Sequence, residues 1–254
     1  MVHDVSKARA VFWDIHRDLP REGPGDRDST ARALRLAEPL PPASRVLDIA
    51  CGPGAQTLDL AELLPEARIE AVDFHQPFVD ETKRRARGQG VDDRVKASRA
   101  DMRTLGYPSG SFDLIWCEGG AYIMGFAKAL RAWRPLLKPT GRLALTEAVW
   151  LSDDAPEEVR RFWSDAYPAM TSIEACRTIV RDCGYRLIGD FVLPQAAWWE
   201  YYRPKQDRLA SLASRYAGDA VAERVLQQAT EEIAIYRRYA AYYGYVFLAM
   251  EPQG

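Results

Sequence analysis

The sequence VLDIACGPG, residues 46–54, joins an apolar run to a cluster of small residues. A short apolar run that ends in turn-forming residues is typical of a buried β-strand. Glycine accepts backbone angles with positive φ and lets a ligand approach the main chain closely. Gly52 and Gly54 at the end of this strand therefore predict a binding loop for a nucleotide-sized ligand.

The rest of the first 150 residues alternates between strand and helix patterns. The predicted strands are 45–51, 68–73, 94–98, 112–117 and 142–149, and the predicted helices between them are 57–64, 77–87 and 126–137. This alternation predicts an α/β fold with a doubly wound, Rossmann-like parallel sheet, whose ligands bind beyond the carboxyl ends of the strands.

The pattern changes after Trp150 and before residue 40. The later segments are predicted helices at 156–166, 173–183, 204–216 and 220–239, strands at 185–193 and 243–250, and an aromatic stretch, AAWWEYYRP, at 196–204. The N-terminal segment has one predicted helix around Phe12 and Trp13, followed by a loop, REGPGD. We expect a helical lid over 1–40 and a main domain over 41–254, with an aromatic and helical cover inserted at about 151–240.

Composition and charge exclude several classes of protein. Of the 254 residues, 47% are hydrophobic and 28% are charged, and the net charge is -2, which is typical of a soluble globular chain without a nucleic-acid surface. The N-terminus is too polar for a secretory signal and no apolar run spans a bilayer, so we expect a cytoplasmic protein with no membrane partner. The four cysteines lack CxxC spacing and the three histidines are scattered, so no metal site is expected.

The glycine loop departs from the dinucleotide fingerprint, because Thr57 stands where G-x-G-x-x-G requires its third glycine. An acid, Asp73, ends the second predicted strand and could accept hydrogen bonds from ribose hydroxyls. Asp101 and Met102 follow the third strand, where a carboxylate could accept from an adenine amine and a thioether could pack on the ring. These residues predict an adenosine-containing ligand without deciding which one.

Four motifs in this order carry a resemblance to a known family: VLDIACGPG, AVDFH (71–75), ADM (100–102) and FDLIWCEGG (112–120). Over about residues 40–150 the chain resembles the class I S-adenosylmethionine (SAM) dependent methyltransferases, of the small-molecule type that includes ubiquinone-biosynthesis enzymes. REGPGD and YYGYVF (242–247) resemble a subgroup of unassigned substrate. The resemblance implies a seven-stranded sheet whose last strand, about 245–250, is antiparallel.

The resemblance also implies roles for individual residues around SAM. The implied cofactor residues are Asp48, Ala50 (where the family usually has glycine), Gly52 and Gly54 at the methionine part, Asp73 at the ribose, Phe74 beside the nucleoside, Asp101 and Met102 at the adenine, and Glu118 at the amino group. Arg21 could pair with the cofactor's carboxylate from a closing lid. Structural alternatives stay open for Asp48 as a partner of loop amides, for Asp101 as a turn cap and for Phe74 as a core residue.

The expected function is transfer of a methyl group from SAM to a small-molecule acceptor; a non-catalytic SAM-binding protein and an NAD(P)-dependent oxidoreductase are the alternatives. Glu118 and Glu147 lie where a proton acceptor could act, although each could be a structural partner. The candidate acceptor-binding residues are Tyr122, Trp150, Trp198 and Trp199. Aromatic faces favour an amine, a sulfonium or a flat apolar acceptor, unless they only attach the cover to the sheet. A homodimer is left open.

Overall fold

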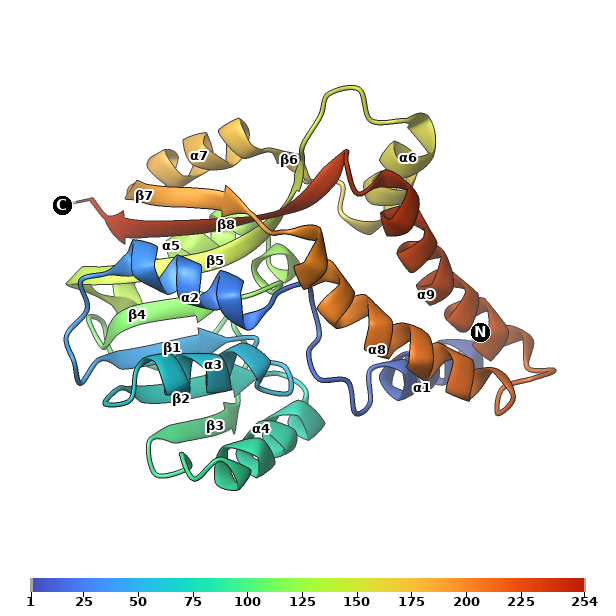
Figure 1. Ribbon diagram of the computed structural model, residues 1–254, viewed down its shortest axis with the longest axis horizontal. Helices are drawn as coiled ribbons and strands as arrows, with labels where there is room; N and C mark the ends of the chain where they lie inside the picture. The colour runs from blue at the N-terminus through green and yellow to red at the C-terminus, as the bar shows by residue number, and fades with distance from the viewer. Residues whose placement is uncertain (1, 254) are drawn as a thin grey trace.

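The computed structural model describes residues 2–253 and shows one sheet with helices on both faces (Figure 1). The strands are β1 (Arg45–Ile49), β2 (Arg68–Asp73), β3 (Val95–Arg99), β4 (Phe112–Cys117), β5 (Leu137–Trp150), β6 (Thr171–Ser172), β7 (Tyr185–Val192) and β8 (Tyr243–Pro252). The helices are α1 (Val2–Ile15), α2 (Arg27–Ala37), α3 (Ala55–Leu63), α4 (Gln76–Gly88), α5 (Phe126–Trp133), α6 (Glu157–Ala166), α7 (Ile173–Asp182), α8 (Gln195–Ala213) and α9 (Ala220–Tyr239), with 3-10 turns η1 (Ala121–Ile123) and η2 (Arg134–Leu136).

The sheet has the order β3-β2-β1-β4-β5-β8-β7, and the two-residue strand β6 pairs with β5 outside this path. Strands β1 to β5 are parallel, whereas β8 is antiparallel to both β5 and β7. The predicted Rossmann-like sheet with an antiparallel last strand is confirmed, but the sheet has eight strands, not seven, because the two-residue β6 adds to the edge of β5. The strand order reverses between β1 and β4, and a crevice for ligands forms at such a point, outside the carboxyl ends of the strands.

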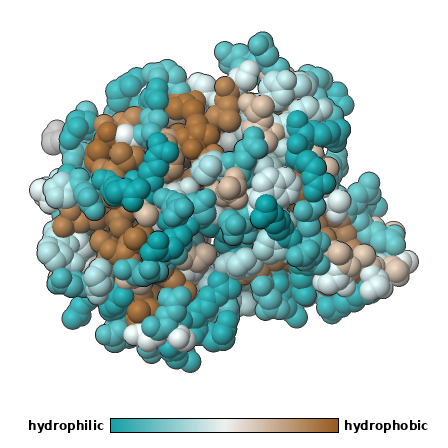
Figure 2. Space-filling model, viewed as in Figure 1, coloured by the Kyte–Doolittle hydropathy of each residue, from teal (hydrophilic) through white to brown (hydrophobic). Residues whose placement is uncertain are grey.

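Helices α2, α3 and α4 cover one face of the sheet, and α5 and α7 cover the other (Figure 1). The central strand β4 is buried along its whole length because both of its faces are covered. On the face seen in Figure 2, polar residues cover much of the surface and hydrophobic residues gather on the left half, over the sheet. The sheet thus gives a rigid support, and the edge formed by the carboxyl ends of its strands remains available for a ligand site.

A second group of helices, α1, α6, α8 and α9, lies beyond the carboxyl ends of the strands (Figure 1). They share an apolar cluster of their own, which includes Val11, Trp198, Tyr202 and Tyr236. The rings of Trp198 and Tyr236 are stacked 4.3 Å apart and join α8 to α9. Among the helices described, none combines the length and apolar character required to cross a bilayer.

Several other elements differ from the sequence prediction, chiefly α8, α2 and β5. AAWWEYYRP is not a separate stretch, because α8 runs from Gln195 through Pro204 without interruption. Pro204 has no backbone N–H, so one hydrogen bond of the helix is lost. The helix continues because one of its faces is buried against the cover; the buried residues of this face include Trp198, Tyr201, Tyr202 and Lys205. Helix α2 was not predicted; Asp26 caps it by accepting a hydrogen bond from the Ser29 amide. Strand β5 begins at Leu137, not at residue 142.

Candidate active site

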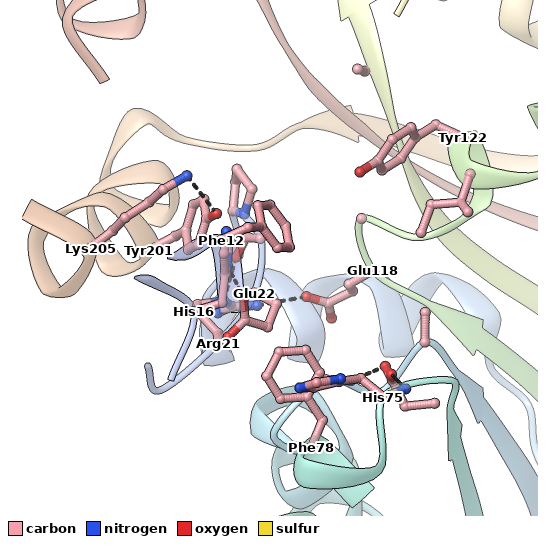
Figure 3. A pocket seen from close by; sticks show the side chains of 18 of the residues that line it. Phe12, His16, Arg21, Glu22, His75, Phe78, Glu118, Tyr122, Tyr201 and Lys205 are labelled. Carbon is pink, nitrogen blue, oxygen red and sulfur yellow. Dashed lines mark hydrogen bonds and ion pairs between the residues drawn. The ribbon is translucent and has the colours of Figure 1, made fainter. Parts of the chain in front are cut away.

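A cavity of about 790 Å³ lies between the carboxyl ends of the strands and the second group of helices. Its walls come from the loops after β1, β2, β3 and β4, from the N-terminal segment, and from α6, α8 and α9. Figure 3 shows side chains from these distant segments pointing toward one another across it. Pockets of about 300–1,000 Å³ hold small molecules and cofactors, so this cavity has room for a nucleoside cofactor and a second ligand.

The glycine loop forms the floor of the cavity. Gly54 has a φ of 90°, and a Cβ there would lie 2.8 Å from the Thr82 side chain, so a larger residue does not fit. Beneath the loop, the buried carboxylate of Asp48 accepts hydrogen bonds from Thr57 Oγ1 at 2.5 Å and from Gln56 Nε2 at 3.4 Å. Thr57, where a dinucleotide fingerprint has glycine, therefore holds Asp48 in place. Burial raises the pKa of Asp48 to about 8.

Ala50 lines the cavity just before the glycines and has a φ of 58°. This left-handed conformation costs an alanine roughly 1–2 kcal/mol, whereas glycine adopts it freely. The backbone at Ala50 thus has a conformation that suits a glycine. The packing of the surrounding structure offsets this strain energy.

Asp73 stands on the rim with both carboxylate oxygens positioned by the backbone. Oδ2 accepts from the Gly52 amide at 3.0 Å and Oδ1 accepts from the His75 amide at 2.8 Å. Burial raises the pKa of Asp73 above its ordinary value. A carboxylate has about four acceptor positions, so Asp73 retains the capacity to accept from two hydroxyl groups of a ligand.

Three other predicted cofactor residues lie further along the same wall. Phe74 has 56% of its surface exposed, with the Arg99 guanidinium over its ring, so it is not a core residue. Asp101 and Met102 line the cavity, and Asp101 Oδ1 also accepts a hydrogen bond from the Arg103 amide. The structure therefore brings together seven of the predicted cofactor residues along the cavity: Ala50, Gly52, Asp73, Phe74, Asp101, Met102 and Glu118. Asp48 and Gly54 lie behind this lining.

Arg21 and Glu118 form a buried ion pair 2.9 Å apart (Figure 3). Glu118 also accepts hydrogen bonds from Thr30 Oγ1 at 2.8 Å and Trp116 Nε1 at 2.9 Å. Gly25 makes room for this pair, because a Cβ there would lie 2.6 Å from Glu118 Oε2. The REGPGD loop is thereby held to the end of β4.

The opposite wall of the cavity is aromatic. Tyr122 and Trp198 line it, together with Tyr201 and Tyr202 of the AAWWEYYRP stretch and with Phe162, Trp163, Tyr167 and Tyr245. Of these, Phe162 and Tyr167 were not identified from the sequence. Trp150 and Trp199 are not among the described residues that line the cavity; their rings lie beside the guanidinium groups of Arg160 and Arg237. The predicted aromatic cluster is thus divided between the cavity and the outer side of the cover.

A buried lysine interrupts this aromatic wall. Lys205 Nζ donates to Tyr201 Oη at 3.0 Å and to Glu232 Oε2 at 2.8 Å. Within the aromatic lining, the Tyr122 hydroxyl points across the cavity toward this group (Figure 3). Lys205 was not a predicted site residue; its helical spacing from Trp198, Tyr201 and Tyr202 is the signal that could have identified it.

Glu147 lies on β5 behind the cavity wall. Its Oε1 accepts a hydrogen bond from Tyr167 Oη at 2.5 Å, and its Oε2 is buried without a partner among the residues described. Burial raises the pKa of Glu147 to about 7. Because Tyr167 lines the cavity, it connects the cavity with a carboxyl group that can exchange a proton near neutral pH.

The N-terminal segment supplies a second pair that the sequence did not predict. His16 and Glu22 lie 2.5 Å apart, Nδ1 to Oε2, and both line the cavity (Figure 3). Nearby, the rings of Trp13 and His75 are stacked at 3.6 Å, which joins α1 to the loop after β2. Among residues 2–253 no group of three or more histidine, cysteine or acidic side chains is arranged to hold a metal ion.

Comparison with known proteins agrees with this geometry. Residues 46–141 match the methyltransferase domain family. The 27-O-demethylrifamycin SV methyltransferase of Amycolatopsis mediterranei is 28% identical over 181 residues, covering 68% of this chain and 64% of the relative. The demethylmenaquinone methyltransferase of Thermus thermophilus is 34% identical over 117 residues, covering 46% of this chain and 52% of the relative. The matched regions thus span between half and two thirds of these relatives.

Solved structures of similar fold extend over nearly the whole chain. A SAM-dependent methyltransferase from Geobacter sulfurreducens, in complex with S-adenosylhomocysteine, has a TM-score of 0.81 at 24% identity and covers 96% of this chain and 98% of its own. A SAM-dependent methyltransferase from Thiobacillus denitrificans, in the same complex, has a TM-score of 0.82 at 23% identity, with the same coverage. Residues 46–141 thus match a methyltransferase domain, and the chain shares its fold with SAM-dependent methyltransferases.

Proposed function

We propose that the protein transfers a methyl group from SAM to a small-molecule acceptor. The observation that carries this proposal is one continuous cavity that joins the glycine loop and Asp73 to the aromatic wall. A sulfonium methyl donor is already activated, so the protein contributes chiefly orientation and exclusion of water. A cavity with a polar end for a nucleoside and an aromatic end for an acceptor fits that task.

On the cofactor side, we assign Asp73 to the ribose hydroxyls, because its two oxygens are held at the rim with acceptor capacity remaining. Phe74 would lie beside the nucleoside, and Asp101 and Met102 at the adenine. The methionine part would lie over the glycine loop, which Asp48 and Gly54 support from below. The orphaned buried oxygen of Glu22 at this end of the cavity also fits a ligand that carries hydrogen-bond donors.

On the acceptor side, we propose a largely apolar, flat small molecule that packs between Tyr122 and Trp198. The polar atoms in this wall, on Tyr201, Lys205 and Glu232, already bond to one another, so the acceptor would meet mainly aromatic surface. The acidic net charge of the chain favours a small molecule over a nucleic acid. We place Trp150 and Trp199 in the support of the cover.

For proton removal we favour Glu147 over Glu118. Both oxygens of Glu118 already accept hydrogen bonds, and Arg21 balances its charge, which suits a role in positioning the N-terminal segment. The Tyr167 phenol can pass a proton from an acceptor group to Glu147 Oε1, whose raised pKa suits a proton acceptor near neutral pH. An acceptor without an acidic proton would not need this step.

We further propose that residues 1–40 act as a lid on a methyltransferase domain at 41–254, with the cover at about 151–240. The stacking of Trp13 on His75 and the pairing of Arg21 with Glu118 hold this segment over the cavity. In the closed state Arg21 would also lie near the cofactor's carboxylate. We place the protein in the cytoplasm, where SAM and small acceptors are available.

The test is incubation of the protein with isotopically labelled SAM and a metabolite extract, followed by mass spectrometry of the labelled products. The wild-type protein should yield a labelled small molecule and S-adenosylhomocysteine. Asp73→Ala should weaken S-adenosylhomocysteine binding roughly 100-fold, because two ribose hydrogen bonds of about 1.5 kcal/mol each are lost. Asp80→Ala, which removes a solvent-exposed carboxylate on α4, is the matched control.

Two results would contradict the proposal. Tight binding of SAM with no labelled product from any extract would indicate a binding protein without turnover. A calorimetric titration in which NADH binds and SAM does not would indicate an oxidoreductase.

A further inference from the structure

Glu22 lies over the glycine loop and also near Lys205 of α8. Gly52 has no side chain, and a Cβ there would come 3.4 Å from Glu22 Cγ and 3.5 Å from Glu22 Cβ. Glu22 therefore approaches the bare side of the loop, where we have proposed that the methionine part of the cofactor lies. It reaches this place from the REGPGD loop, which the Arg21–Glu118 pair fixes to the end of β4.

The carboxyl group of Glu22 is only half satisfied. Oε2 is paired with His16 Nδ1, while Oε1 is buried and has no hydrogen-bond partner among the residues that the structure describes. A buried polar atom left unpaired costs about 1–3 kcal/mol. Such an atom in the wall of a ligand cavity indicates a ligand group that would satisfy it, and a carboxylate requires a donor.

The charged groups that face Glu22 come from four elements, and none of the cations among them is free. His16, which directly follows α1, pairs with it, and Asp73 at the end of β2 repels its negative charge. Lys205 on α8 is held by Glu232, and Arg85 on α4 is held by Glu81 and by backbone carbonyls. Among the described residues around Glu22, these groups leave no unpaired cation for Oε1, so a ligand is the remaining source of one.

We propose that Glu22 binds the α-ammonium group of the amino-acid part of SAM and makes the site selective for cofactors that carry a free α-amino group. This inference rests on the proposed function. Arg21, the preceding residue, would then face the α-carboxylate, so that two consecutive residues of opposite charge would recognise the two charges of an amino acid. A buried carboxylate bonded to an ammonium is stronger than a neutral hydrogen bond.

The protonation of the pair agrees with this role. Burial raises the pKa of Glu22 to about 9 and lowers the pKa of His16 to about 3. In the free protein burial thus favours the neutral forms of both Glu22 and His16. An arriving ammonium favours the ionised carboxylate, so the negative charge forms only where the cofactor compensates it.

The test is a cycle of two proteins and two ligands, measured by calorimetry. The proteins are the wild type and Glu22→Gln; the ligands are S-adenosylhomocysteine and its analogue with hydrogen in place of the α-amino group. Glu22→Gln should weaken binding of S-adenosylhomocysteine at least tenfold and change binding of the deamino analogue by less than about threefold. Glu62→Gln, a solvent-exposed carboxylate on α3, is the matched control and should change neither.

The outcomes separate the two proposals. If the wild type binds neither ligand, the proposed cofactor, and with it the proposed function, is wrong. If the wild type binds S-adenosylhomocysteine and Glu22→Gln weakens both ligands equally, or weakens neither, the assignment of Glu22 is wrong while the proposed function stands. Glu22→Met, of similar length and without a hydrogen-bonding group, repeats the comparison should the glutamine variant fail to fold.

Discussion

Replacing Glu147 by glutamine should make the stability of the protein less dependent on pH. Glu147 is 3% exposed, and its pKa is raised from 4.5 to about 7 because burial disfavours the charged form. The native chain thus holds this proton more tightly than the unfolded chain does. The resulting stabilisation is fully present below pH 4.5 and is lost as the pH rises to about 7.

The size of the expected change in unfolding free energy follows from the same shift in the pKa of Glu147. At about 1.4 kcal/mol for each pH unit, a pKa moved from 4.5 to about 7 corresponds to roughly 3 kcal/mol. Glutamine has no such proton to lose, and its carbonyl oxygen can still accept the hydrogen bond from Tyr167. The free energy of unfolding of Glu147→Gln, relative to wild type, should therefore improve by roughly 3 kcal/mol between about pH 4.5 and pH 8.

The assay is urea denaturation of both proteins at pH 5, 6, 7 and 8. Other buried carboxyl groups, such as Asp48 and Glu22, titrate in both proteins and largely cancel in the difference. Glu157→Gln, whose wild-type side chain is 78% exposed, is the control and should show a nearly constant difference. A difference between Glu147→Gln and wild type that does not change with pH would refute the argument that burial holds a proton on Glu147.

Two further substitutions test the loops that shape the cavity. Ala50→Gly should raise the stability of the protein by about 0.5–1 kcal/mol in thermal denaturation, because glycine adopts a φ of 58° without strain. The control Ala55→Gly, at the start of α3, should lower the stability. A lower melting temperature for Ala50→Gly than for wild type would contradict the strain argument. Arg21→Met should cost about 3 kcal/mol, because it leaves the buried carboxylate of Glu118 without its cation. Adding Glu118→Gln to Arg21→Met should recover part of that loss, and a single variant as stable as wild type would show that the ion pair is not needed.

The sequence alone determined the fold and one side of the site. The glycines of VLDIACGPG follow β1, Asp73 ends β2 and Asp101 follows β3. The carboxyl ends of parallel strands meet at one edge of the sheet. A local motif therefore fixes the place of its residues in space. The antiparallel last strand followed from the resemblance to a family, and the pairing of β8 with β5 and β7 confirms it.

Helical propensity was a poorer guide in the cover. Pro204 and the aromatic residues before it indicated a break, but α8 continues through them because its buried face packs against α1 and α9. Helix α2 was missed because its small apolar face is recognisable only beside the sheet that buries it. In both cases tertiary burial outweighed local preference.

Only the tertiary structure decided which charged groups meet. Arg21 and Glu118 are 97 positions apart in the chain, and Tyr167 and Glu147 are 20 apart. His16 and Glu22 are close in sequence. The unpaired oxygen of Glu22, its raised pKa and the lowered pKa of His16 nevertheless arise from burial by α8 and the glycine loop. Burial and pairing depend on all the elements that pack around a group, whereas a motif records only its own segment of the chain.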